Sequence, residues 1–211
     1  MSGEGTTVEA APPARALLLR LADLPATPWK NGGGTTVEYA VRPAGAGLAD
    51  FEWRVSRARV AEAGPFSNFP DVDRTLAVVE GDGIDLVFAD RREHLGRFDP
   101  PLAFPGDVAV DGRPTAGPIV DLNVMTRRGR WSHRVERRKV EGSLAVALDG
   151  ATTFVVAGGA LRVVLGEAEA FDLAPGDALR LDGPTALVLE APRPTDALVA
   201  RLHPSDEPGR P

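Results

Sequence analysis

The chain has 211 residues, of which 43% are hydrophobic, so it is long enough to bury a core and too apolar to be disordered. It contains no cysteine, which excludes disulfides, thiolate metal ligands and a cysteine nucleophile. The formal net charge of −6 argues against nucleic acid and against an anionic membrane surface as partners.

The distribution of glycine and proline favours an all-β chain. The 23 glycines and 19 prolines interrupt the sequence too often for long helices. Residues 1–13 lack both a basic n-region and an apolar h-region, so we expect a disordered leader rather than a signal peptide. No run reaches the roughly 18 apolar residues of a membrane span. We therefore expect a cytoplasmic protein that ends in a polar tail at residues 206–211.

Several strands are predicted in the first half of the chain. Residues 16–21 form a short apolar run, and residues 35–42 and 51–60 alternate between apolar and polar side chains. Residues 74–80 and 84–88 are joined at Gly81-Asp82-Gly83, which predicts a hairpin. Residues 91–101 are polar and are predicted to be a surface excursion.

The most informative predicted strand covers residues 118–126. Val120, Leu122 and Val124 form one face, whereas Asp121 and Asn123 lie on the other. Two polar side chains on one side of an apolar strand indicate a face that lines a wet cavity.

Residues 127–139 carry six arginines, one lysine and His133 against the single acid Glu136. An anion-binding patch is one interpretation of this segment. A solvated strand or a crossing between two domains is the favoured one, because the whole chain is acidic.

The C-terminal third repeats the pattern of the middle third. VVAGGALRVV at 155–164 echoes VVEGDGIDLV at 78–87, and FDLAPGD at 171–177 echoes FD at 98–99 and FPGD at 104–107. Two copies of the pattern predict two similar β units. We place the first at residues 14–128 and the second, smaller one at 129–205.

A glycine-turn hairpin followed by a Pro-Gly-Asp turn is similar to the turns of cupins, which are small double-sheet β barrels. Longer motifs occur in a specific order: PWKNGGGT (28–35), FEWRVS (51–56), GPFS (64–67), FP (69–70), RTL (74–76) and DLNVM (121–125). Over residues 16–203 the chain thereby resembles the HutD/Ves family. The resemblance implies a bicupin fold and a cytoplasmic bacterial protein, with family members associated with histidine utilisation or with stress responses.

Many cupins bind a metal through paired histidines, a glutamate and a third histidine. Here His94, His133 and His203 lie far apart, and aspartates follow both Pro-Gly turns. A histidine-based metal site is therefore not expected, whereas an all-oxygen site for a divalent cation stays open. No cofactor is expected, and no Ser-His-Asp order supports covalent catalysis.

The glycine run at 32–34 is neither a phosphate-binding loop nor a dinucleotide fingerprint. Lys30 precedes the glycines, and the element that follows them is a predicted strand rather than a helix. Two interpretations stay open: exposed backbone N–H groups that cradle a carboxylate, or a turn that leads into a barrel strand.

The remaining polar residues predict a metabolite-binding pocket in the N-terminal unit. Its cations suit a small carboxylate, and the resemblance suggests urocanate or formylglutamate. The ligand-binding residues that we predict are Trp29, Lys30, Asn31, Gly32, Gly33, Arg54, Ser56, Ser67, Phe69, Arg74, Asp121 and Asn123.

Alternatives to this pocket remain. Trp53 suits a core position equally well, and Arg74 with Asp121 would form a structural ion pair. A metal-free isomerase or hydrolase, with Asp121 or Glu38 as the base, is the alternative to a binding protein. A structural or regulatory partner protein is a third interpretation. Pairing of edge strands would allow a homodimer.

Overall fold

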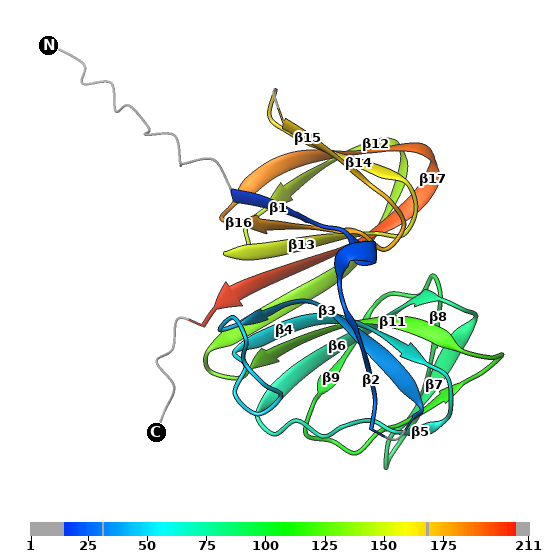
Figure 1. Cartoon of the computed structure of the whole chain (residues 1–211). Coiled ribbons are helices and arrows are strands. Elements are labelled where there is room, and N and C mark those ends of the chain that lie inside the picture. The colour runs from blue at the N-terminus through cyan, green and yellow to red at the C-terminus, as the bar shows by residue number, and fades with distance from the viewer. Residues whose placement is uncertain (1–14, 31, 168, 206–211) are drawn as a thin grey trace, which may run out of the picture.

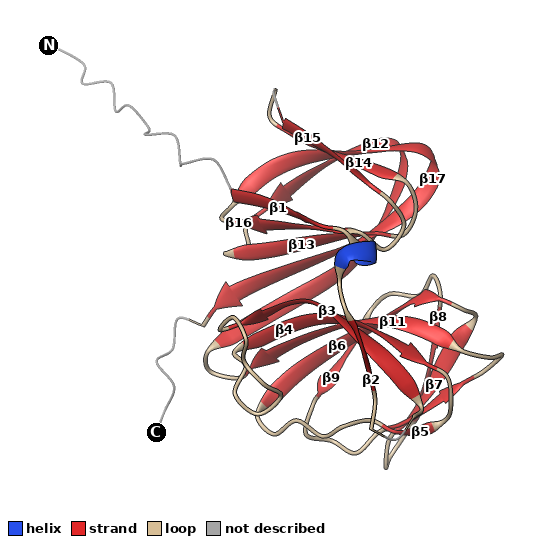
Figure 2. Cartoon of the chain, in the orientation of Figure 1, coloured by secondary structure: helices blue, strands red, loops and turns tan. Residues whose placement is uncertain are grey.

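The computed structural model describes residues 15–30, 32–167 and 169–205, and it shows two β-barrel-like units that lie one above the other in Figure 1. Its one helix in this part of the chain is the 3₁₀ turn Leu21–Asp23, and strands dominate (Figure 2). The all-β prediction is confirmed. The predicted leader and tail lie outside the described residues. No helix in the described ranges is long and apolar enough to cross a membrane.

The N-terminal unit consists of a six-stranded sheet, in the order β2-β3-β4-β11-β6-β9, and a four-stranded sheet, in the order β5-β10-β7-β8. The six-stranded sheet contains β2 (Ala26–Pro28), β3 (Gly34–Arg42), β4 (Trp53–Val60), β6 (Val72–Glu80), β9 (Leu102–Pro105) and β11 (Ile119–Arg127). The four-stranded sheet contains β5 (Gly64–Pro65), β7 (Gly83–Val87), β8 (Arg92–Gly96) and β10 (Asp111–Pro114). Leu76 and Val78 of the first sheet pack against Ile84 and Leu86 of the second, so these side chains mark the barrel interior.

The C-terminal unit is a seven-stranded sheet with its own apolar core. It contains β1 (Arg15–Leu19), β12 (Trp131–Leu148), β13 (Thr152–Ala157), β14 (Leu161–Leu165), β15 (Glu169–Leu173), β16 (Ala178–Asp182) and β17 (Thr185–Pro204). The long strands β12 and β17 pair antiparallel, with a register shift between Val140 and Gly142.

The first strand of the chain completes the C-terminal unit. β1 pairs antiparallel with β16, from Arg15 opposite Asp182 to Leu19 opposite Ala178. Residues 15–19 thus belong by pairing to the second unit, although they fall in the sequence range predicted for the first. After the turn Leu21–Asp23 the chain enters the N-terminal sheet as β2, which pairs with β3. The first residues of the described chain therefore contribute one strand to each unit.

The two units pack through the outer face of the six-stranded sheet. Trp53 is buried there and meets Trp131 and Phe154 edge to face, with ring centroids 6.2 Å and 5.8 Å away. Trp53 is therefore a core residue. Beside it, the ring nitrogens of His133 lie 2.7–2.8 Å from the hydroxyls of Thr75 and Thr126, and burial lowers the pKa of His133 to about 4.

One of two polar segments differs from expectation. Within the predicted surface excursion at 91–101, residues 92–96 form the edge strand β8; its buried residue is Leu95, so the apolar pattern is too sparse to reveal a strand. The basic segment 127–139 runs from the end of β11 through a turn into the first half of β12, which agrees with a strand at the domain crossing. Its arginines pair with carboxylates: Arg128 contacts Asp73 and Asp107.

Candidate functional site

A group of polar side chains lines the interior of the N-terminal barrel. Residues paired directly across antiparallel strands share a face of the sheet. Asn123 of β11 lies opposite Ser56 and Leu76, and Asp121 lies opposite Ala58 and Val78, so both polar residues share the face of the interior Leu76 and Val78. We call this group the polar wall; it comprises Glu38, Arg54, Ser56, Arg74, Asp121 and Asn123.

Arg74 is the cation at the centre of the polar wall. Its Nε donates a hydrogen bond of 2.8 Å to Oδ1 of Asn123, and its guanidinium lies over the rings of Phe66 (4.6 Å) and Phe104 (5.5 Å). Within the described residues, neither terminal amino group of Arg74 donates a hydrogen bond. Burial lowers the pKa of Arg74 to about 10, so the side chain stays charged at neutral pH.

Asp121 is the most buried acid of the polar wall, with 1% of its surface exposed. Its Oδ1 accepts a hydrogen bond from the amide of Asn123, whereas its Oδ2 has no partner in the described part of the chain. Burial raises the pKa of Asp121 to about 7, against the opposing attraction of Arg74. Arg74 and Asp121 do not form the ion pair that the sequence allowed, because the side chain of Asn123 connects them.

The outer part of the polar wall is already paired. Nε of Arg54 donates to Glu38 at 2.6 Å, and its Nη1 lies 3.4 Å from the hydroxyl of Ser56. The Glu38 side chain is 38% exposed and that of Arg54 is 15% exposed. This pair therefore lies nearer to solvent than Asp121. The positive charge of Arg54 balances the negative charge of Glu38.

The glycine-rich stretch forms the turn between β2 and β3. The backbone N–H of Trp29 donates to the carbonyl of Gly34, and Gly32 has a positive φ of 75° that favours glycine. The indole of Trp29 donates to Thr36 at 2.8 Å. Lys30 is exposed at this turn, and the predicted Asn31 lies outside the described residues. A turn that leads into a barrel strand is thus confirmed.

Two other predicted residues border the polar wall without a hydrogen bond to it among the described residues: Ser67 follows Phe66, and Phe69 packs in a cluster with Met125, which lies opposite Arg54 and Arg74. Ser67 is exposed, and Phe69 packs edge to face on Phe51 with ring centroids 6.1 Å apart. The structure brings together five of the predicted residues in the polar wall: Arg54, Ser56, Arg74, Asp121 and Asn123.

A small cavity of about 60 Å³ lies beside Phe66 and the glycine-rich turn. Its lining includes the predicted Trp29 and Gly33 together with Phe66. The ring of Phe66 also covers the guanidinium of Arg74. Phe66 therefore contacts both this cavity and the polar wall.

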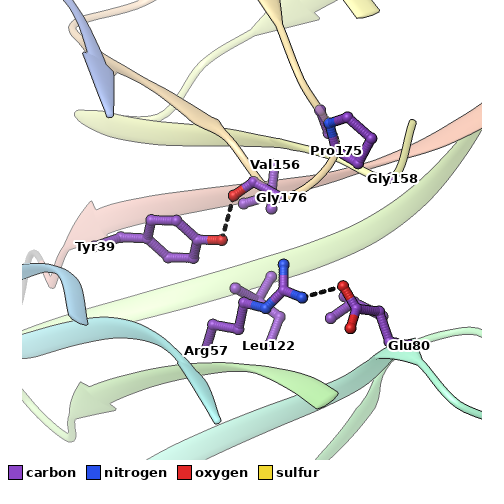
Figure 3. Close-up of a pocket in the computed structure, with 10 residues that line it drawn as sticks. Tyr39, Arg57, Glu80, Leu122, Val156, Gly158, Pro175 and Gly176 are labelled. Carbon is purple, nitrogen blue, oxygen red and sulfur yellow. Dashed lines mark hydrogen bonds and ion pairs between the residues drawn. The ribbon is translucent and has the colours of Figure 1, made fainter. Parts of the chain in front are cut away.

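A second cavity, of about 40 Å³, lies between the two units (Figure 3). Tyr39 reaches across it and donates a hydrogen bond of 2.6 Å to the carbonyl of Gly176, while Arg57 pairs with Glu80. The volume suits one or two water molecules rather than a metabolite. Sequence reasoning missed these residues; the alternation along β3, which puts Tyr39 on the face opposite Glu38, was the available signal.

Replacing Tyr39 by phenylalanine is expected to cost about 1 kcal/mol of unfolding free energy, because the buried Gly176 carbonyl loses its donor. Urea denaturation at pH 7 measures this cost. Tyr39 is the single tyrosine, and burial raises its pKa, so the phenolate absorbance of the folded protein should appear above the usual pH of about 10. Unchanged stability together with an ordinary titration would contradict this contact.

Comparison with known proteins finds a family, sequence relatives and solved structures that are similar to this chain. The HutD family model matches residues 21–199. A protein from Pseudomonas putida, described as an uncharacterized 21.2 kDa protein in the hutC 3′ region, is 34% identical over 168 residues, which is 79% of this chain and 86% of the relative.

The chain belongs to the HutD family. Protein Ves from Citrobacter koseri is 35% identical over 144 residues, 68% of this chain and 70% of its own. HutD from Pseudomonas fluorescens SBW25, a structure titled with a formate condition, has a TM-score of 0.77 and 30% identity, covering 90% of this chain and all (100%) of that one.

The same comparisons confirm a cupin-like fold for this HutD family member. Salicylate 1,2-dioxygenase from Pseudoaminobacter salicylatoxidans, in a structure of its adducts with gentisate, has a TM-score of 0.61 at 11% identity, covering 96% of this chain and 88% of that one. At this identity the likeness concerns the fold alone.

A metal ion of the kind that many cupins hold does not fit the polar wall. The described residues contain no group of three or more histidine, cysteine or acidic side chains placed to hold a metal ion. Two guanidinium groups, of Arg54 and Arg74, stand beside the acids, and Glu38 is paired with Arg54. Such a donor set favours an anion over a divalent cation.

Proposed function

We propose that this HutD family member binds a small carboxylate metabolite on Arg74 inside the N-terminal barrel, without a metal. The observation that supports the proposal is the way in which the guanidinium of Arg74 is held. Asn123 fixes its Nε and Phe66 supports its plane, while both terminal amino groups lack partners among the described residues. A planar guanidinium held in this way is suited to two parallel hydrogen bonds to a carboxylate.

The cavity beside Phe66 is the proposed entrance. Phe66 lines this cavity and also covers Arg74, so rotation of its ring would join the cavity to the polar wall. Trp29 and Gly33 line the same cavity, which gives the predicted glycine-rich turn a place at its rim. A ring that moves aside on binding also excludes water from the bound anion.

The biological role that we propose is an accessory or regulatory one in histidine utilisation, in the cytoplasm. The family name and the location of the Pseudomonas putida relative in a hutC 3′ region support this pathway. Urocanate and N-formylglutamate are therefore the first ligands to test, with acetate as the simplest carboxylate.

The Arg74→Lys variant is expected to bind these acids about 10- to 100-fold more weakly than the original protein, because a lysine ammonium cannot form the paired hydrogen bonds. Isothermal titration calorimetry at pH 6 measures the affinities. Arg59→Lys, an exposed arginine on β4, is the matched control and should leave them unchanged. Equal affinities in all three proteins, or no binding at all, would contradict the proposal.

The second candidate function is a metal-free isomerase or hydrolase that acts on a small acid. The free Oδ2 of Asp121 and its pKa of about 7 favour this residue over Glu38 as a base, because Glu38 is paired with Arg54. Turnover of urocanate or N-formylglutamate, followed by proton NMR and abolished in Asp121→Asn, would support the enzyme. Binding without turnover supports the binding protein.

A further inference from the structure

The free oxygen of Asp121 has no role in holding the fold. Among the described residues, three buried side-chain atoms lack a hydrogen-bond partner, and Oδ2 of Asp121 is the one that belongs to a carboxylate. A buried acceptor without a donor is costly, so such an atom in a barrel interior points to a ligand. The other oxygen, Oδ1, is already occupied by Asn123.

The orientation of Asn123 determines where Asp121 can carry a proton. An arginine only donates hydrogen bonds, so the atom of Asn123 that faces Arg74 must be its carbonyl oxygen. The amide NH₂ then faces Asp121 and donates to its Oδ1. A proton on Asp121 is therefore left to Oδ2, the unpartnered oxygen of the wall.

An anion bound to Arg74 would lie close to Asp121, because the single side chain of Asn123 links the two residues. Two adjacent negative charges in a buried site are disfavoured, and one of them takes up a proton. We infer that Asp121 binds the ligand as a neutral acid: its Oδ2–H donates to the carboxylate held by Arg74, and anion and proton enter the barrel together. This inference rests on the proposed anion site.

Among the described residues, no other charged group near Asp121 could balance the second negative charge in place of this proton. On the neighbouring strands, Arg54 pairs with Glu38, and Arg57 pairs with Glu80 on the opposite face of the sheet. The four-stranded sheet presents apolar side chains to the interior. Arg74 is thus the one cation of the wall without an acidic partner, and its single charge balances one anion rather than two.

A protonated Oδ2 on Asp121 determines the class of ligand. A carboxylate that offers an oxygen to Oδ2–H fits, and no covalent bond is made or broken: above the pKa of Asp121 one proton is taken from the buffer for each anion bound. A ligand that presented a cationic N–H to Asp121 would favour the ionised acid and release a proton instead. The sign of the proton exchange therefore separates the two classes.

The test is the pH dependence of binding between pH 6 and pH 9, with acetate and N-formylglutamate as probes, because neither titrates in this range. We expect the dissociation constant to rise about tenfold per pH unit above pH 7. Calorimetry in triethanolamine and in Tris, two cationic buffers that differ in ionisation enthalpy and do not compete for an anion site, should count about one proton taken up per probe bound at pH 8.

The Asp121→Asn variant provides the sharper readout, because its amide donates at every pH as the neutral acid does. We expect its affinity at pH 6 to lie within about threefold of the original protein and to stay constant up to pH 9, whereas Asp121→Ala should be weak throughout. Asp82→Asn, at an exposed turn of the same unit, should keep the original pH profile.

Different failures have different meanings. Binding that depends on Arg74 but is independent of pH, or that releases a proton, would overturn this inference and leave the anion site intact. Absence of binding for acetate, N-formylglutamate and urocanate at every pH would overturn the proposed function and this inference with it.

Discussion

Replacing Asp196 with alanine is expected to destabilise the folded chain by about 3–5 kcal/mol, because it leaves the buried Arg137 and the half-buried Arg97 without their carboxylate. Asp196 of β17 accepts from Arg97 through two contacts of 3.2 Å and also pairs with Arg137. Arg137 reaches across to the N-terminal unit and donates to the carbonyl of Val78 at 2.7 Å. The cluster therefore joins the two units, and its loss should weaken both together.

The pH dependence of this cluster has a definite sign. Burial opposes ionisation of Asp196, but the hydrogen bonds from Arg97 and Arg137 outweigh it, so the pKa of Asp196 lies below its ordinary value. A depressed carboxyl pKa stabilises the fold above the unfolded pKa of about 4, and this stabilisation is lost as the pH falls through the folded pKa. Acid should therefore weaken the contact between the units.

Urea denaturation at pH 7 and at pH 3 tests both statements, with Asp196→Asn as a second variant that keeps the shape and removes the charge. The difference between the original protein and Asp196→Asn should shrink toward pH 3. Asp172→Ala, at an exposed ion pair with Arg162, is the control and should change stability by less than about 1 kcal/mol. A loss at Asp196→Ala no larger than at this control would show that the cluster is not a buried ion pair.

The two faces of β11 could be predicted from the sequence. Alternation along residues 118–126 separates Asp121 and Asn123 from Leu122 and Val124, and the structure places the two pairs on opposite sides of β11. The polar interior face was predicted from the alternation of successive side chains between the two faces of this strand alone. The turn at the glycine run was one of two interpretations that the sequence left open, and the structure shows it with a positive φ at Gly32.

The partners of these side chains could not be predicted, because they depend on the pairing of distant strands. Arg74 and Asn123 are 49 residues apart, and the register of β6 against β11 decides that they meet. An ion pair of Arg74 with Asp121 was equally consistent with the sequence. β1 and β16 are separated by even more of the sequence than Arg74 and Asn123 are. No pattern in residues 16–21 shows which of the two barrels this strand joins.

Replacing Asp121 with asparagine is expected to make the fold less sensitive to pH and more stable in mild alkali. The pKa of Asp121 is raised from 3.8 to about 7 by burial, so the folded state holds its proton more tightly than the unfolded chain does. The cost of ionising Asp121 is absent below pH 4, grows as the pH rises to 7, and is complete above 7. At about 1.36 kcal/mol per pKa unit this cost approaches about 4 kcal/mol.

The asparagine amide is neutral at every pH and escapes that cost, although it places an unpartnered NH₂ where Oδ2 lies. We therefore expect the stability of Asp121→Asn relative to the original protein to increase by about 3–4 kcal/mol between pH 4 and pH 8. Urea denaturation across this range measures the change, and Asp82→Asn should show none. An original protein whose stability rises with pH relative to Asp121→Asn would mean that Arg74 holds Asp121 ionised.

A stabilising change at Asp121 has a consequence for function. Near neutral pH, the buried Asp121 lowers the stability of the ligand-free protein. Destabilising groups of this kind are typical of residues that act on a ligand. A carboxylate that arrives with a proton would remove this cost by neutralising Asp121. Ligand binding should therefore stabilise the original protein more strongly as the pH falls from 9 to 6, whereas Asp121→Asn should gain equally at both.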